Sequence, residues 1–256
     1  MKIQYPLSPL CKKIEKIAEK CGKIILKADR NAFAIDVKAG HANFVTAYDK
    51  MIEAKLKKEL TALLPEAVFV GEEGDTADDI RHGYAFIVDP IDGTTDFIHG
   101  YPISCVSIGL LKDGKPVLGV VCQPYLREIY SAELGRGAYL NGKPIHVSDN
   151  DLANGLVLFG TSPYKTELHE KTMQMALEYL NRATDLRRSG SAAFDICTVA
   201  AGRAELFFEW TLSPWDYAAS SLILTEAGGI ITTLDGDEIS FEHPCSILAR
   251  NREETK

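Results

Sequence analysis

Two aspartates three residues apart follow an apolar run near the middle of the chain. The run, Tyr84–Val88, is rich in aromatic and β-branched residues and predicts a buried strand. Asp89 and Asp92 stand at its end, and Gly93 then permits a tight turn into a short helix that starts near Thr94. Carboxylates at this spacing can converge on a hard cation, and free N–H groups at a helix start suit a phosphate. Either aspartate alone is typical of a polar turn, but the whole string predicts metal-assisted phosphoryl chemistry.

Four more acidic residues occupy places from which they can reach the same site. Glu72 follows a short predicted strand, where open α/β sheets bind ligands, and Glu209 follows another. Asp49 and Asp216 each stand at the third position of a predicted helix, after Thr46 and Ser213 respectively. An acid there caps the helix and complements its dipole, and from the residues alone this role is favoured over catalysis for Asp49.

Basic residues are sparse around these acids. Lys38 stands in an irregular segment, residues 31–43, where an exposed loop residue is the simplest interpretation. Arg187 and Arg188 precede a predicted helix start, so they are either exposed or placed for an anionic substrate, including one with a second phosphate. The six histidines are scattered and form no H-x-x-x-H pair, which argues against zinc chemistry.

Composition limits the class of protein. The 256 residues are 46% hydrophobic and 25% charged, as in an ordinary soluble domain. A formal charge of −8 argues against a general nucleic-acid or membrane-surface binder. Six scattered cysteines indicate buried thiols in a reducing compartment, and no run has the length of a membrane span or the pattern of a signal peptide. We therefore expect a cytoplasmic protein that binds a small phosphorylated metabolite.

Periodicity predicts alternating helices and strands. We expect helices over residues 9–30, 47–64, 166–180, 192–201 and 214–226, and strands over 68–70, 84–88, 103–110, 116–122, 128–132, 138–140, 156–159 and 204–208. In the helix over 166–180, the methionines are expected to fill core rather than form a binding surface. The apolar side chains of this helix are Leu168, Met173, Ala176, Leu177 and Leu180. The polar stretch 148–154 divides a single catalytic unit, 1–256, into possible halves: 1–148 with most metal ligands, and 149–256 completing the site.

Six motifs in order along the chain resemble the inositol monophosphatase family of magnesium-dependent, lithium-sensitive phosphatases. They are Val45–Asp49, Gly71–Glu73, Asp89–Thr95, Gly190–Ala193, Trp215–Ala219 and Glu226–Gly229. The resemblance covers most of the chain. It implies an α+β fold, a layered αβαβα sandwich of the inositol monophosphatase and fructose-1,6-bisphosphatase type, and usually a homodimer.

The resemblance also implies a reaction. It is hydrolysis of a phosphate monoester, with inositol monophosphate favoured, by direct in-line attack of water. Within the same chemistry, the alternatives are histidinol phosphate, fructose 1,6-bisphosphate, NADP and 3′-phosphoadenosine 5′-phosphate. From a different class, a catalytically silent relative that binds metal or anion is the competing hypothesis.

The resemblance implies two or three Mg²⁺ ions per active site. Glu72, Asp89 and the carbonyl of Ile91 would hold the first ion. Asp89, Asp92 and Asp216 would hold the second, and Glu72 with waters would hold a weaker third.

The remaining residues receive roles from the same resemblance. Asp49 and Thr94 would orient the attacking water, which replaces the capping interpretation of Asp49, and Glu72 would be catalytic with them. The backbone N–H groups of Gly93 and Thr94 would hold the phosphate. The other residues expected to contact substrate are Asp92, Ala192, Glu209 and Asp216. Lys38 matches a basic residue of the family's metal loop, and Arg188 is a possible phosphate contact.

Overall fold

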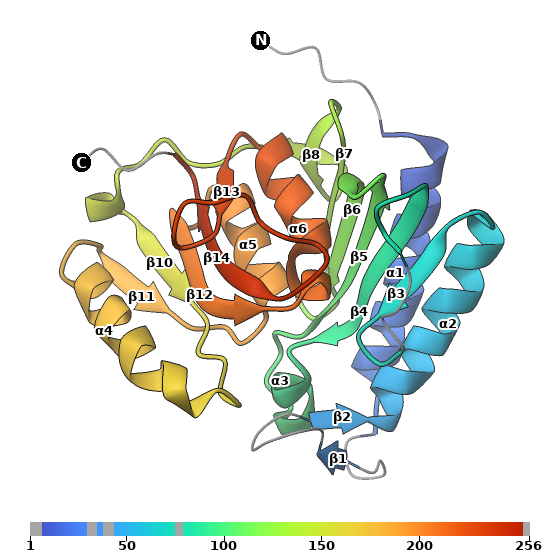
Figure 1. Cartoon of the computed structure of the whole chain (residues 1–256), viewed down its shortest axis with the longest axis horizontal. Coiled ribbons are helices and arrows are strands. Elements are labelled where there is room, and N and C mark those ends of the chain that lie inside the picture. Colours follow the sequence, from blue (N-terminus) through green and yellow to red (C-terminus); the bar gives the residue numbers. More distant parts are fainter. Residues whose placement is uncertain (1–6, 30–34, 38–43, 75–78, 253–256) are drawn as a thin grey trace.

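Two β-sheets alternate with three layers of helices (Figure 1). The computed structural model describes residues 7–29, 35–37, 44–74 and 79–252. Helices α1 (Pro9–Lys27) and α2 (Ala47–Leu63) cover the outer face of the larger sheet, and α4 (His169–Leu180) covers the outer face of the smaller one. Between the sheets lie α5 (Ala192–Ala200) and α6 (Pro214–Glu226). This αβαβα order confirms the predicted fold class.

The larger sheet has seven strands in the order β3-β4-β5-β6-β7-β8-β9. Their bounds are Val68–Gly71, Tyr84–Asp92, Cys105–Lys112, Lys115–Gln123, Glu128–Glu133, Gly137–Leu140 and Lys143–Ile145. Only β3 and β4 are parallel; the other neighbours are antiparallel, as expected for a meander. Two tight hairpins turn at Asp113-Gly114 and Asn141-Gly142, where all four residues have positive φ. Asp-Gly and Asn-Gly suit both turns, since these residues tolerate that conformation.

The smaller sheet has five strands in the order β11-β10-β12-β14-β13. Their bounds, in that order, are Asp185–Arg187, Leu156–Phe159, Leu206–Leu212, Cys245–Arg250 and Ile230–Thr232. Short elements complete the described chain: β1 (Ile35–Val37), β2 (Phe44–Thr46), α3 (Thr94–His99) and the 3₁₀ turns Leu152–Asn154 and Thr166–Leu168. Along the chain, the polar stretch 148–154 thus connects the larger sheet to the smaller one. The division into two halves stays a prediction.

Helix starts follow from local side-chain chemistry. The Ser8 hydroxyl accepts a hydrogen bond from the N–H of Cys11 at 3.2 Å, and Pro9 occupies the first turn of α1. A capping box begins α2, because Thr46 and Asp49 bond each other's backbone N–H groups. Ser213 and Asp216 form the same arrangement at the start of α6.

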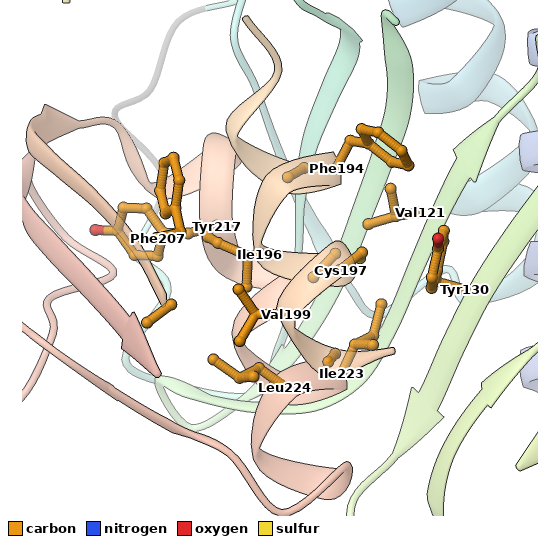
Figure 2. Close-up of a cluster of buried hydrophobic side chains, with 14 of the residues drawn as sticks. Val121, Tyr130, Phe194, Ile196, Cys197, Val199, Phe207, Tyr217, Ile223 and Leu224 are labelled. Carbon is orange, nitrogen blue, oxygen red and sulfur yellow. The ribbon is translucent and has the colours of Figure 1, made fainter. Parts of the chain in front are cut away.

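The core between the sheets is built around α5 and α6 (Figure 2). Phe194 and Cys197 of α5 lie near Val121 and Tyr130 of the larger sheet in Figure 2. Phe207 of the smaller sheet belongs to the same cluster. Burial of these side chains fixes α5 and α6 against both sheets, and so fixes the starts of both helices.

Helix α6 packs directly on the middle of the larger sheet because two strand residues lack side chains. A Cβ at Gly109 would lie 2.9 Å from the Cβ of Ala218, and one at Gly119 would collide with the carbonyl oxygen of Ala219. The close approach places the first turn of α6 beside the end of β4.

The prediction that the methionines of α4 fill core is wrong for Met173, whereas Met175 is partly buried against the cluster that contains Phe208. Met173, Leu177 and Leu180 are 58%, 59% and 46% exposed. The buried face consists of Thr172, Ala176 and Tyr179, one residue earlier along the helix.

All six cysteines are free thiols, and five of them are buried, as predicted. Across the described ranges, no helix combines the length and apolar character needed to cross a membrane.

Candidate active site

Strand β4 delivers Asp89 and Asp92 to the junction of the two sheets. Residues three apart in a regular strand point to opposite faces, but the pairing with β5 becomes irregular between these two positions. Both carboxylates therefore line one cavity. Asp216, in the first turn of α6, approaches them, and one carboxylate oxygen of each residue lies within 4.8 Å of the other two. The structure thus brings together three of the predicted metal ligands.

The donor set of this cluster fits a hard divalent cation. Burial, followed by the charges of Glu72, Asp92 and Asp216, raises the pKa of Asp89 well above its usual value. Burial and the charges of Asp92 and Glu72 do the same to the pKa of Asp216. A bound cation would remove this repulsion between buried like charges. The ligands are all oxygen atoms, which suits Mg²⁺, Mn²⁺ or Ca²⁺ rather than zinc.

The carboxylate of Asp92 is held by the start of α5. Its Oδ2 accepts hydrogen bonds from the Ser191 hydroxyl at 2.6 Å and the N–H of Ala193 at 2.7 Å, and its Oδ1 accepts one from the N–H of Ala192 at 3.3 Å. The thiol of Cys105 lies 3.6 Å from Oδ2. Most of this bonding falls on Oδ2, which leaves Oδ1 the freer oxygen for a cation.

Glu72 and Ile91 stand beside Asp89 in the same cavity. The N–H of Glu72 donates to the carbonyl of Val88 at 3.2 Å, which fixes the loop after β3 against β4. The N–H of Ile91 donates to Asp89 Oδ1 at 2.8 Å, so Asp89 Oδ2 stays available. Glu72 is half-buried and lines the cavity with Ile91 and Asp89.

The two carboxylate oxygens of Asp49 contact two different residues. Oδ2 accepts the N–H and hydroxyl of Thr46 at 2.8 and 2.6 Å, which is the capping box of α2. Oδ1 lies 3.2 Å from the hydroxyl oxygen of Thr94, which is also 3.1 Å from the carbonyl oxygen of Ile91, so the single hydroxyl proton has two possible acceptors. The capping interpretation and the contact with Thr94 therefore hold together, one for each oxygen.

The cavity has a volume of about 320 Å³ and is strongly acidic. Among the described residues, the charged lining consists of seven acids and one base: Glu72, Asp89, Asp92, Asp96, Asp195, Glu209, Asp216 and Arg188. The wall also includes Gly93, Thr94 and Ala192 from the predicted set. Gly93 precedes α3 with a φ of 91°, a conformation that favours glycine.

Glu209 lines the cavity from the middle of β12, not after the strand as predicted, because the strand continues to Leu212. The segment after β10 fixes its carboxylate. Its Oε1 accepts the N–H and hydroxyl of Ser162, both at 2.8 Å, while Ser162 holds an unusual φ of 40°. A Cβ at Gly160 would collide with the Glu209 carboxylate, so glycine is required there. Burial raises the pKa of Glu209 to about 7, against the opposing hydrogen bonds from Ser162.

Of the two adjacent arginines, one lines the cavity and the other pairs with a neighbouring acid. Arg188 lines the cavity, and its guanidinium donates to the Thr161 hydroxyl at 3.3 Å. Arg187 pairs with Asp185 on β11 and is not among the residues that line the cavity. Lys38 lies outside the described residues.

Sequence reasoning missed four residues that shape this cavity. Gly160 and Ser162 hold Glu209, and Asp96 and Asp195 add acids to the wall. The only local signal for the first two was a small-residue turn directly after the predicted strand 156–159. Asp195 falls within the predicted helix 192–201, most of whose other residues are small or apolar.

Comparison with known proteins agrees with the fold and the cavity. Residues 7–256 match the profile of the inositol monophosphatase family. Inositol monophosphatase 2 of Saccharomyces cerevisiae is 41% identical over an alignment of 233 residues, and the match covers 85% of this chain and 79% of that protein.

Solved structures show the same likeness. The extragenic suppressor protein suhB from Bartonella henselae superposes with a TM-score of 0.88 at 33% identity, covering 95% of this chain and 94% of that one. SaIMPase-II with inositol monophosphate bound superposes with a TM-score of 0.80 at 29% identity, covering 96% and 90%. The layered fold is that of a class of phosphatases. Within that class, the chain belongs to the inositol monophosphatase family.

Proposed function

We propose that this chain hydrolyses a phosphate monoester in a Mg²⁺-dependent reaction, with inositol monophosphate as the favoured substrate. The observation that carries the proposal is the convergence of Asp89, Asp92 and Asp216, with Glu72 lining the same cavity. No ordinary structural role explains several buried carboxylates so close together, because each raises the others' cost of ionisation.

These acids would hold the metal ions in the arrangement that the family resemblance implies. Glu72, Asp89 and the Ile91 carbonyl would form one site, and Asp89, Asp92 and Asp216 a second. Bound there, Mg²⁺ lowers the pKa of a coordinated water and offsets negative charge on phosphoryl oxygens.

The chain's own residues would then position the reactants. Thr94 and Asp49 form a hydrogen-bonded pair at the edge of the metal cluster, and in this proposal they orient the attacking water and accept its proton. The N–H groups of Gly93 and Thr94 would bind the phosphate. Glu209, fixed by Ser162, would accept hydrogen bonds from hydroxyls of the leaving alcohol.

The choice of inositol monophosphate is supported by the name of one relative and the bound ligand of another. It is also supported by the position of Glu209, since a carboxylate acceptor suits a polyol. Lithium sensitivity and a homodimer belong to the same proposal, and the cytoplasmic compartment stays a prediction.

Phosphate release from a panel of esters tests the proposal. The panel contains myo-inositol 1-phosphate, histidinol phosphate, fructose 1,6-bisphosphate, NADP and 3′-phosphoadenosine 5′-phosphate, each with Mg²⁺, with chelator and with Li⁺. We expect Mg²⁺-dependent, lithium-inhibited release that is fastest from inositol phosphate. Faster release from another ester would replace the substrate and keep the reaction. Release from none, with ordinary Mg²⁺ binding, would favour the catalytically silent relative.

A further inference from the structure

Asp96 is a buried acid of the cavity wall that the proposed chemistry leaves without a role. It lies in the first turn of α3, and its side chain is only 8% exposed. Its Oδ2 is completely buried and has no hydrogen-bond partner within the described part of the chain. Because this oxygen is buried, the Asp96 carboxylate acts on a ligand in the cavity through its charge rather than through a hydrogen bond to Oδ2.

Gly190 shows where this oxygen points. A Cβ at Gly190 would collide with Asp96 Oδ2, and Gly190 lines the cavity directly before α5. Gly190 also has a φ of 103°, which disfavours other residues. The Asp96 carboxylate therefore packs against the loop that carries Arg188 and Ser191.

The charge in this part of the cavity is unbalanced. Beyond the acids assigned to metal, Asp96, Asp195 and Glu209 line the cavity, with Arg188 as the one base among the described lining residues. Arg188 lowers the pKa of all three acids, so its charge is shared among them. Burial still raises the pKa of Asp96, to about 6, which leaves this carboxylate ionised at neutral pH.

We propose that Asp96 is a specificity residue that selects against esters whose leaving alcohol carries a second anionic group. The proposal rests on the phosphatase function proposed above. The negative charge of Asp96 attracts an ammonium group, has little effect on a neutral hydroxyl, and repels a phosphate or carboxylate. Because Arg188 is shared among three acids, it does not offset a further anion. Neutral polyol and amino-alcohol phosphates are thus accepted, and bisphosphates and phosphorylated acids are disfavoured.

Three esters with one carbon skeleton isolate this effect. Glycerol 3-phosphate, 3-phosphoglycerate and 3-amino-2-hydroxypropyl phosphate differ only in the group farthest from the phosphate, which is neutral, anionic or cationic. Phosphate release with Mg²⁺ gives kcat/KM for each ester, with wild-type protein and with Asp96→Asn. We expect the wild type to prefer the neutral and cationic esters. In Asp96→Asn the ratio of kcat/KM for the anionic to the neutral ester should rise roughly tenfold, about 1.4 kcal/mol.

Two further variants keep the result interpretable. Asp235→Asn removes an equal charge from an exposed position outside the cavity lining and should leave the ratio unchanged. Asp96→Ser removes the charge without placing an amide against Gly190, so a shared shift in both Asp96 variants assigns the effect to charge. An unchanged ratio in both folded variants, or an equal shift in Asp235→Asn, would overturn the inference. With myo-inositol 1-phosphate as a fourth ester, release from none of the four by wild-type protein would instead overturn the proposed function, and the inference with it.

Discussion

Removal of the Ser191 hydroxyl should weaken metal binding without disturbing the fold. Ser191 donates the shortest of the hydrogen bonds to Asp92, at 2.6 Å, and both residues are buried. In Ser191→Ala the carboxylate keeps its bonds from the N–H groups of Ala192 and Ala193 but loses a donor that favours its ionised form.

The expected magnitude follows from the type of contact. A hydrogen bond to a charged group contributes about 1.5–3 kcal/mol. Loss of a residue that orients a metal ligand typically lowers metal affinity by about 10–100-fold, which corresponds to about 1.4–2.7 kcal/mol. The two ranges agree, so we expect the dissociation constant for Mg²⁺ to rise by at least about tenfold.

Titration calorimetry of chelator-treated protein with Mg²⁺ measures this change. Ser221→Ala is the matched control, because that buried hydroxyl donates only to the carbonyl of Ala218 in its own helix. Ser191→Thr keeps the hydroxyl and should recover most of the affinity. Wild-type affinity in Ser191→Ala, with the fold intact by circular dichroism, would refute the claim that α5 positions Asp92 for a cation.

Three other variants test further parts of the account. Glu209→Gln removes an acid whose folded-state pKa is raised from 4.5 to about 7. Ionisation of this buried acid lowers the protein's free energy of unfolding as pH rises between those values. In chelator near pH 8, the variant's free energy of unfolding in urea should therefore exceed that of the wild type by up to about 3 kcal/mol, with no gain near pH 4. Equal pH profiles would contradict this. Gly160→Ala displaces the Glu209 carboxylate and should raise KM for inositol phosphate roughly tenfold with a smaller change in kcat; an unchanged KM would remove Glu209 from substrate binding. Gly119→Ala forces α6 away from the sheet at Ala219 and should lower the free energy of unfolding by about 1–3 kcal/mol, and an unchanged urea midpoint would count against this packing.

Features set by neighbouring residues could be predicted from the sequence. Ser8-Pro9 begins α1 as expected, and the tight turns at Asp113-Gly114 and Asn141-Gly142 fall where the residues tolerate positive φ. The acids at the end of β4 were predicted for the same reason, since a strand followed by a turn at Gly93 leaves them at the end of that strand. Each of these conclusions depends on fewer than ten consecutive residues.

Contacts between distant segments could not be predicted. Ser191 meets Asp92 across 99 residues of chain, and Ser162 meets Glu209 across 47. No local pattern records such pairs, because they depend on how α5 and the segment after β10 pack. The unpartnered oxygen of Asp96 is visible only once Gly190 is placed beside it.

The error in α4 has a different cause. The helix carries two apolar stripes offset by one residue, so periodicity alone does not decide which one faces the sheet. Tyr179 determines which stripe faces the sheet, since its ring packs on Phe208 of β12 with 5.3 Å between ring centroids. An aromatic side chain contributes more buried area than Leu177 or Leu180 would, and the helix rotates to bury it.

Phosphate release from myo-inositol 1-phosphate by wild-type protein and Asp92→Asn tests the central claim most directly. Asp92 joins the metal cluster to the start of α5, and the substitution keeps its shape while removing its charge. The account predicts Mg²⁺-dependent release by the wild type and no detectable release by a variant that retains the wild-type circular dichroism spectrum. Near-normal release by Asp92→Asn would contradict the assignment of Asp89, Asp92 and Asp216 as the catalytic metal centre.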